Sequence, residues 1–402
     1  IYFTSDDGYV YCLTADKGEL VWKFRGGPSD RKILGNKRLI STWPARGGVV
    51  LEDGILYFAA GIWPFMGTFI YALDAESGEI IWRNESTGAH YINQPHNSPA
   101  FGGIAPQGTF VISGDRLLIP GGRSIPGCFD KNTGEMLYFH LAEYNKSTGA
   151  FTCANDDYFF NHFRDRETNL YRVDTGEIID EVMGKYPVMT KDVFYMSGDS
   201  ILVRDAKNPK TVLATFHVNA QTDLIKAGPF LYAAGNDSIT CLKLQTPTLA
   251  SVVWRKRVNN VERLIAADGK LFAVTLDGNL LAFGASQGPA QALKRSSSTK
   301  SPSAETLLQA EEILHQTGAQ DGYALLYGTG NGDLLSALVQ KSDLFIIGVD
   351  ADKQNIETCR RRFDALGLLG HRVSFLPGTP ETFPAPPYMA SLIVINNPQK
   401  LS

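Results

Sequence analysis

The sequence predicts a multidomain protein, in which an all-β repeat region precedes an α/β domain. Three observations support this prediction. A strand–turn–strand pattern recurs through the first two thirds of the 402 residues. A stretch rich in Ser, Gln, Pro and Lys, residues 287–302, then follows without apolar periodicity and is typical of a flexible linker. Beyond it, short apolar runs alternate with amphipathic segments, as in parallel β/α folds.

Composition narrows the class of protein. A hydrophobic content of 44% and a charged content of 20% are typical of a globular protein with ample core material. The net charge of -4 lacks the excess of positive charge that is typical of nucleic-acid-binding proteins. No apolar run approaches the ~20 residues of a membrane-spanning helix. The five cysteines are scattered without a C-x-x-C pair, so we expect buried thiols and no metal site.

The repeat is clearest at residues 72–82 (ALDAESGEIIW), which follow the pattern A-x-D-x-x-[S/T]-G-x-x-x-W. Residues 12–22 (CLTADKGELVW) and 128–138 (CFDKNTGEMLY) carry the same pattern with substitutions. Residues 171–180 (YRVDTGEIID) are a shortened copy. Each copy predicts a strand, a tight turn in which glycine tolerates positive φ, and a second strand.

Further short strands lie between these copies and are separated by Asp-Gly turns. Together they give about seven four-stranded units at a spacing of ~40 residues, which is typical of propeller blades. Residues 1–286 are therefore predicted to form an all-β propeller with seven recognisable repeats. The chain opens with a strand in mid-blade, so we expect the natural protein to begin upstream and to have eight blades.

The repeated hairpin resembles the tryptophan-docking motif of quinoprotein-like (PQQ-binding-like) propellers, which include pyrroloquinoline quinone dehydrogenases and non-catalytic scaffolds. The resemblance implies that Trp22, Trp82 and Trp254 pack between neighbouring blades. The dehydrogenases also use a vicinal Cys–Cys disulfide, a calcium ion and a catalytic Asp. No two cysteines are adjacent in this sequence, and no position matches the rest of that site. Pyrroloquinoline quinone is therefore not an expected cofactor, and a docking scaffold is favoured over a quinone-dependent oxidoreductase.

Two insertions interrupt the repeats, at residues 28–48 and 90–103. We expect long irregular loops here, on which a protein or small-molecule partner could bind. His90 and His96 are only weak evidence for a metal ion, because loop histidines bonded to the backbone are more common. Arg46 is expected to bridge two blades.

After the linker, residues 303–402 predict the first half of an α/β Rossmann-like domain. Ser301 or Ser303 can cap its first helix. The chain stops after the fourth strand, whereas complete sheets of this type have more strands, so the domain is expected to be truncated. The predicted elements are strands at 323–327, 344–349, 372–376 and 392–396, and helices at 333–340 and 353–366.

The turn after the first of these strands carries the strongest functional signal. It consists of Gly328, Thr329, Gly330, Asn331 and Gly332. A dinucleotide-binding fingerprint would require a further glycine at position 333, where the sequence has Asp. Asp350 ends the second strand, where a carboxylate can accept from both hydroxyls of a ribose.

This G-x-G-x-G turn resembles motif I of class I S-adenosylmethionine-dependent methyltransferases. The resemblance implies that S-adenosylmethionine lies over residues 328–332 with its ribose against Asp350. Ala351, Gly378 and Thr379 are the further expected cofactor contacts. No catalytic residue is identified, because Asn396-Asn397-Pro398-Gln399 only partly matches the N-P-P-[YF] motif of amino-methylating enzymes.

Three interpretations of the whole chain remain open, of which the quinone-dependent oxidoreductase named above is the third and least favoured. In the first, this is a fragment of a larger protein in which a propeller scaffold is joined to an active methyltransferase-like domain. In the second, the propeller is a non-enzymatic binding scaffold and the Rossmann-like domain has lost its ligand. Propellers of this kind imply a periplasmic or cell-envelope location, whereas an active methyltransferase implies the cytoplasm.

Overall fold

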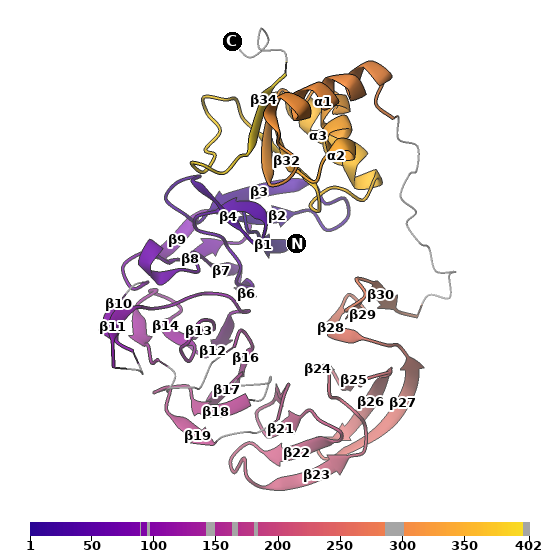
Figure 1. Cartoon of the computed structure of the whole chain (residues 1–402). Helices are drawn as coiled ribbons and strands as arrows, with labels where there is room; N and C mark the ends of the chain where they lie inside the picture. Colours follow the sequence, from indigo (N-terminus) through magenta and orange to yellow (C-terminus); the bar gives the residue numbers. More distant parts are fainter. Residues whose placement is uncertain are drawn as a thin grey trace. The chain divides into compact units, whose positions relative to one another are not determined.

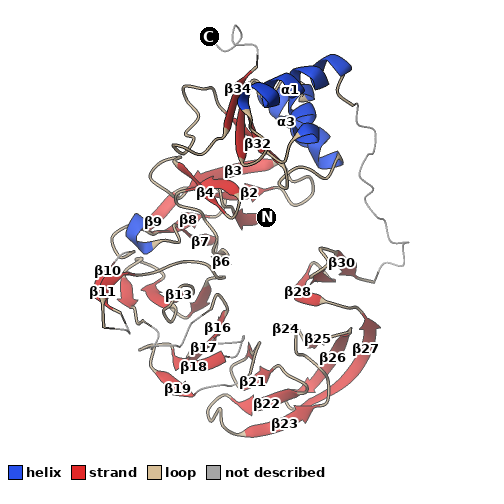
Figure 2. Ribbon diagram, in the orientation of Figure 1, coloured by secondary structure: helices blue, strands red, loops and turns tan. Residues whose placement is uncertain are grey.

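The structure is a computed structural model that describes residues 1–88, 90–94, 97–141, 149–162, 168–180, 184–285 and 301–396. The chain divides into two compact units, which are drawn in Figure 1. The first comprises Ile1–Pro28 and Thr42–Gln287, and the second comprises Ser29–Ser41 and Gly288–Ser402. Figure 2 shows that strands dominate the first unit and that the long helices belong to the second. The predicted linker lies outside the described residues except at positions 301 and 302.

Seven antiparallel sheets follow one another along the first unit, which confirms a propeller of seven blades. Five sheets have four strands, and the first and last have three in the described part of the chain. The strands of the first four sheets are β1 (Tyr2–Thr4), β2 (Tyr9–Leu13), β3 (Leu20–Arg25); β6 (Val50–Glu52), β7 (Ile55–Ala60), β8 (Phe69–Asp74), β9 (Ile80–Asn84); β12 (Val111–Ser113), β13 (Arg116–Ile119), β14 (Gly127–Asp130), β15 (Met136–Tyr138); and β16 (Thr152–Ala154), β17 (Tyr158–His162), β18 (Thr168–Arg172), β19 (Ile178–Asp180).

The last three sheets continue the same order. Their strands are β20 (Val188–Met189), β21 (Val193–Met196), β22 (Ile201–Asp205), β23 (Val212–Phe216); β24 (Asp223–Ala227), β25 (Phe230–Ala234), β26 (Ser238–Thr246), β27 (Leu249–Arg257); and β28 (Val261–Ala267), β29 (Lys270–Thr275), β30 (Leu280–Phe283). The first strands of successive sheets contact one another from β12 through β16, β20 and β24 to β28.

The core of the propeller is a series of apolar layers, each between two neighbouring sheets. Adjacent residues of one strand serve different layers, because side chains alternate between the two faces of a sheet. Leu56 of β7 packs with Val10 of the first sheet, whereas the next residue, Tyr57, packs with Leu117 of the third. The same alternation recurs at Phe159 and Phe160 of β17.

The last aromatic residue of each clear repeat docks onto the turn of the next sheet. The indole Nε1 of Trp22 donates to the backbone oxygen of Ala75 at 3.2 Å, and that of Trp82 donates to Lys131 at 2.8 Å. Tyr138 occupies the same position in the third sheet, and its hydroxyl donates to the oxygen of Val173 at 3.1 Å. The two tryptophans therefore lie at successive blade interfaces as predicted, although both are only partly buried.

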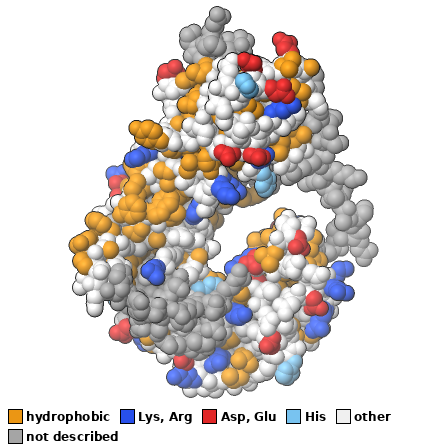
Figure 3. Space-filling model, in the orientation of Figure 1, with side chains coloured by type: hydrophobic (Ala, Val, Ile, Leu, Met, Phe, Trp, Pro, Cys, Tyr) orange, Lys and Arg blue, Asp and Glu red, His pale blue; other side chains and the backbone are white. Residues whose placement is uncertain are grey.

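The two insertions are not the irregular loops expected from the sequence. Residues 28–48 contain the hairpin β4 (Lys32–Gly35) and β5 (Arg38–Ser41), joined through two residues with positive φ, Asn36 and Lys37. Residues 90–103 contain the hairpin β10 (His90–Asn93) and β11 (Pro99–Gly102). In the view of Figure 3, hydrophobic side chains gather over this second hairpin and the neighbouring sheet. His96 lies outside the described residues.

The second unit contains a parallel sheet with the strand order β33-β32-β31-β34. Every strand and helix predicted from position 323 onward is present, with ends shifted by one or two residues. Ser303 caps the first helix by accepting a hydrogen bond from the N–H of Thr306 at 3.1 Å. The elements are α1 (Ala304–Thr317), β31 (Tyr323–Tyr327), α2 (Asp333–Lys341), β32 (Phe345–Asp350), α3 (Lys353–Ala365), β33 (Val373–Pro377) and β34 (Leu392–Ile395).

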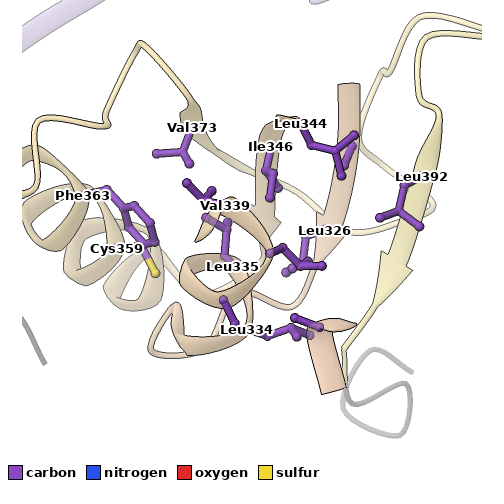
Figure 4. Close-up of a cluster of buried hydrophobic side chains, with 14 of the residues drawn as sticks. Leu326, Leu334, Leu335, Val339, Leu344, Ile346, Cys359, Phe363, Val373 and Leu392 are labelled. Carbon is purple, nitrogen blue, oxygen red and sulfur yellow. The ribbon is translucent and has the colours of Figure 1, made fainter. Parts of the chain in front are cut away.

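The two faces of this sheet are covered differently. The three helices pack on one face, where Leu326, Ile346 and Val373 lie in a core with helix residues such as Leu335 and Phe363 (Figure 4). On the opposite face, Leu325, Tyr327, Ile347 and Val349 are covered by loop side chains. These are Phe383 and Met389 from the segment between β33 and β34, together with Leu39 of the β4–β5 hairpin.

Candidate functional site

The glycine-rich turn between β31 and α2 lies at the carboxyl end of the parallel sheet. Its three glycines all have positive φ, 79° at Gly328, 51° at Gly330 and 83° at Gly332. The N–H of Gly328 donates to the oxygen of Val349 in β32 at 2.8 Å. The turn is therefore held directly beside the end of the neighbouring strand, where Asp350 follows.

The carboxylate of Asp350 holds this turn in place. Its Oδ2 accepts from the N–H of Thr329 at 2.7 Å, from the hydroxyl of Thr329 at 2.9 Å and from the N–H of Gly330 at 3.2 Å. The amide of Asn355 in α3 donates to the same oxygen at 3.1 Å. Its Oδ1 accepts from the N–H of Asp352 at 2.9 Å. The side chain is 7% exposed, so most of its surface faces these donors.

These contacts determine the charge state of Asp350. Burial alone would raise the pKa of this carboxyl, since it disfavours the ionised form. The hydrogen bonds from Asp352, Thr329, Asn355 and Gly330 outweigh burial and lower the pKa below its ordinary value. The group is therefore ionised at neutral pH, as an acceptor of hydroxyl hydrogen bonds should be.

A second set of polar contacts fixes the start of α2. Arg362 of α3 donates to the oxygen of Asn331 at 2.8 Å and to Oδ1 of Asp333 at 2.6 Å. The side-chain amide of Asn331 donates to the other oxygen of Asp333 at 2.7 Å. The side chain of Asn331 is thus used in contacts within the turn. The carboxylate of Asp333 lies at the first residue of α2.

The turn has room for a ligand at one glycine only. A Cβ atom on Gly330 would meet no atom within 4 Å. At Gly328 it would meet the oxygen of Asn396 at 2.7 Å, and at Gly332 it would meet the ring of Phe363 at 3.0 Å. Gly328 and Gly332 are therefore required by packing, whereas Gly330 is the point at which the backbone is open to a neighbouring molecule.

The remaining predicted contacts lie around the same strand ends. Ala351 directly follows Asp350 and is exposed. The N–H of Gly378 donates to the backbone oxygen of Asp350 at 3.1 Å, so the end of β33 is adjacent. The hydroxyl of Thr379 lies 3.0 Å from that of Thr382 and belongs to a local turn. The structure thus brings the predicted residues together, but it engages Thr379 elsewhere.

Two residues of the site were not predicted from the sequence. Asn355 bonds Asp350 as described above, and Asn396 at the end of β34 donates its amide to the oxygen of Gly328 at 3.1 Å. Asn355 belongs to no recognisable motif, and Asn396 begins the partial N-P-P-[YF] match, which does not predict a contact with the turn. Each could be found only by knowing that α3 and β34 pack beside the turn, which follows from the strand order.

Within the described ranges, no group of three or more His, Cys, Asp and Glu side chains could hold a metal ion. Among those same residues, no helix is both long and apolar enough to cross a membrane.

Comparison with known families gives one match. Residues 6–100 are similar to a family model described as "Outer membrane protein assembly factor BamB" (PQQ_2). This match covers the first blades and supports a propeller of the PQQ-like type. No curated protein matches the chain.

Several solved structures resemble the chain weakly. BamB from Moraxella catarrhalis is 12% identical over 70% of this chain and 92% of its own, with a TM-score of 0.43. The WD40 β-propeller domain of Doa1 is 12% identical over 71% of this chain and 89% of its own, with a TM-score of 0.42. A putative S-adenosyl-L-methionine-dependent methyltransferase from Methanococcus maripaludis is 26% identical over 24% of this chain and 44% of its own, with a TM-score of 0.23. At these TM-scores the likenesses carry no argument about function.

Proposed function

We propose that the second unit binds S-adenosylmethionine and is a methyltransferase-like domain of the Rossmann type. The observation that carries this proposal is the turn at Gly330, which is open to a neighbouring molecule and lies beside the ionised carboxylate of Asp350. The strand order β33-β32-β31-β34 supports it, because the order reverses next to β31. Open α/β sheets bind their ligands at that reversal, outside the carboxyl ends of the strands.

The charge at the start of α2 favours this cofactor over a dinucleotide. In dinucleotide-binding folds the pyrophosphate lies at the helix N-terminus, where the helix dipole attracts anions. Here the carboxylate of Asp333 already occupies the first helical residue. It would repel a pyrophosphate, even though Arg362 partly neutralises it. The amino-acid portion of S-adenosylmethionine carries an ammonium beside its single carboxylate and no phosphate, so it meets less of that repulsion.

The residues present fit S-adenosylmethionine in two respects. The backbone at Gly330 permits close approach, and Oδ1 of Asp350 accepts only the N–H of Asp352 in the described structure. That oxygen can accept a ribose hydroxyl while Oδ2 continues to hold the turn. When bound, the cofactor supplies an electrophilic methyl group. This chain's residues bind and orient it, and no acid or base is assigned.

For the first unit we propose a protein-binding scaffold in the cell envelope. The family model matched by residues 6–100 supports this proposal, and the exposed β10–β11 hairpin is the first candidate surface. A second candidate function for the whole chain is a scaffold whose α/β domain no longer binds a ligand. The four donors on Oδ2 of Asp350 favour it, since they give this carboxylate a structural role without any cofactor.

Calorimetry with two glycine variants tests the cofactor proposal. Gly330→Val and Gly370→Val introduce the same side chain at positive φ, and a Cβ meets nothing within 4 Å at either position. The two variants therefore share the backbone strain. Gly330→Val should abolish binding of S-adenosylmethionine and S-adenosylhomocysteine, whereas Gly370→Val should bind both like the unmodified chain. NAD serves as the competing ligand. Binding of NAD in preference to both compounds, or equal loss in the two variants, contradicts the proposal.

A further inference from the structure

A cavity of about 650 Å³ lies where the first strands of the propeller sheets converge. It is lined by the segments that enter the sheets from β6 to β28. Its charged side chains are Arg46, Asp223 and Arg263, and Phe151 and Tyr186 contribute aromatic surface. A volume of this size is within the ~300–1,000 Å³ of small-molecule sites.

One wall of the cavity is a rigid aromatic cluster. The rings of Phe151 and His162 stack with centroids 4.7 Å apart. Tyr186 lies across both, with centroids 5.7 Å from Phe151 and 5.4 Å from His162. It is 1% exposed, and its N–H donates to the hydroxyl of Ser197 at 2.6 Å. The platform is therefore fixed before any ligand arrives.

Arg263 lies on this platform. Its guanidinium carbon is 4.8 Å from the ring centroid of Tyr186, a cation–π contact. Its side chain is 43% exposed, and its Nη1 is 3.8 Å from Oδ1 of Asp223, beyond hydrogen-bond distance. Within the described residues, the guanidinium donates no hydrogen bond.

Asp223 is the counter-charge of this arginine, and its carboxylate is also occupied by backbone donors. Its carboxylate is 5% exposed and already accepts from the N–H of Leu224 at 3.0 Å and from that of Leu264 at 2.7 Å. Burial raises the pKa of this carboxyl, whereas the N–H of Leu264 and the charge of Arg263 act against that rise. Arg263 thus forms an ion pair with Asp223 at 3.8 Å but makes no hydrogen bond to that carboxylate.

A second guanidinium faces the same cavity. Arg46 is held by Asp6, with Nε 2.7 Å from one carboxylate oxygen and Nη2 3.3 Å from the other. This pair bridges the first two sheets, as the sequence suggested. Both arginines are therefore preorganised, and the apolar side chains of Phe151, Leu224 and Leu264 line the space around them.

We propose that this cavity binds a carboxylate group attached to an apolar moiety. The carboxylate pairs with the free edge of Arg263, since a planar guanidinium matches a carboxylate in a two-pronged geometry. The apolar part lies against the aromatic wall. Two sources share this chemistry, a free small organic acid and the C-terminal carboxylate of a partner peptide.

Calorimetry on the full chain tests the site with N-acetylphenylalanine and with N-acetylphenylalanine amide. The acid should bind and the amide should not. Arg263→Gln should weaken binding of the acid at least tenfold, on the scale of hydrogen bonds to a charged group. Arg257→Gln is the matched control, because Arg257 is an exposed arginine of β27 outside the cavity. Arg263→Lys keeps the positive charge but loses the paired donors of the planar guanidinium. It should therefore weaken binding of the acid less than Arg263→Gln does.

A hexapeptide that ends in Phe, with a free or an amidated C-terminus, distinguishes the two sources. Tighter binding of the free-acid peptide than of N-acetylphenylalanine assigns the site to a peptide terminus. The reverse order assigns it to a small acid. The proposal is overturned if neither acid binds, if the amide binds as well as the acid, or if Arg263→Gln binds like Arg257→Gln. Should Arg263→Gln fail to fold, equal affinity of Arg263→Lys and the unmodified chain overturns it instead.

Discussion

Both units build turns on glycines with positive φ, but they use these glycines in opposite ways. In the propeller, a Cβ on Gly134 would lie 2.5 Å from the ring of Trp82. Only glycine leaves enough space for the aromatic side chain at this position. In the second unit, a Cβ on Gly330 would meet nothing. Gly54 is equally open but lies in the tight turn between β6 and β7. An open glycine thus indicates a ligand only where strand ends converge beside it.

The largest effect should come from filling a crowded glycine. Gly134→Ala should destabilise the propeller by about 4 kcal/mol, because left-handed backbone strain adds to displacement of Trp82. Gly54→Ala carries the strain without the clash and should cost only about 1–2 kcal/mol. Denaturant unfolding can be followed by tryptophan fluorescence, since all five tryptophans precede residue 255. Equal midpoints for the two variants would contradict the docking role of Gly134.

Removing the docked aromatic should have the next largest effect. Trp82→Ala should cost about 3 kcal/mol, at the low end for a large aromatic because this side chain is only partly buried. Trp82→Phe keeps ring contact but loses the hydrogen bond to Lys131, and should cost about 1 kcal/mol. The same unfolding measurement checks both variants. An unchanged midpoint for Trp82→Ala would rule out a structural role at the interface.

In the second unit, the glycine turn is held by the ionised carboxylate of Asp350 and not by a docked aromatic ring. The stability that this carboxylate contributes should therefore depend on pH. Asp350→Asn should cost about 2 kcal/mol at pH 7. The folded-state pKa of Asp350 is lowered. Its contribution is therefore complete above the unfolded pKa of about 3.9 and is lost as pH falls through the folded value. Helical circular dichroism follows this unit. If the difference between variant and parent is the same at pH 7 and at pH 2, the carboxylate does not act through its charge.

The smallest expected effect is none at all. Reconstitution of the chain with pyrroloquinoline quinone and calcium should yield no alcohol-dependent dye reduction. The reason is the absence of adjacent cysteines and of a matching ligand set in the sequence. Reduction of the dye above a protein-free control would contradict this prediction and would indicate a quinone-dependent oxidoreductase.

The repeat and the β/α alternation were predictable because both are periodic. Glycine spacing located the hairpins, and apolar runs located β31 to β34 within one or two residues. The β4–β5 hairpin was not predicted, although Gly35-Asn36-Lys37-Arg38 separates two short apolar pairs. Two apolar residues on each side, flanked by charged residues, are too few to show the alternation typical of a strand. Positive φ at both Asn36 and Lys37 is the turn that such hairpins prefer.

The candidate site was predictable only in part. The glycine turn and Asp350 could be located because their order along the chain follows the strand order. That Asp350 would already bond Thr329, Gly330 and Asn355 could not be predicted, since these contacts depend on how α3 packs. The cavity with Arg263 was also missed, because its residues come from six separate sheets and share no motif.

The docking bonds of the first unit all point in one direction along the chain. Trp22 holds the turn of the second sheet, Trp82 that of the third, and Tyr138 that of the fourth. Each of these bonds joins two successive blades, so the local opening of one blade also breaks a contact of its neighbour. Partial unfolding should therefore spread from blade to blade across these three interfaces, whichever blade opens first.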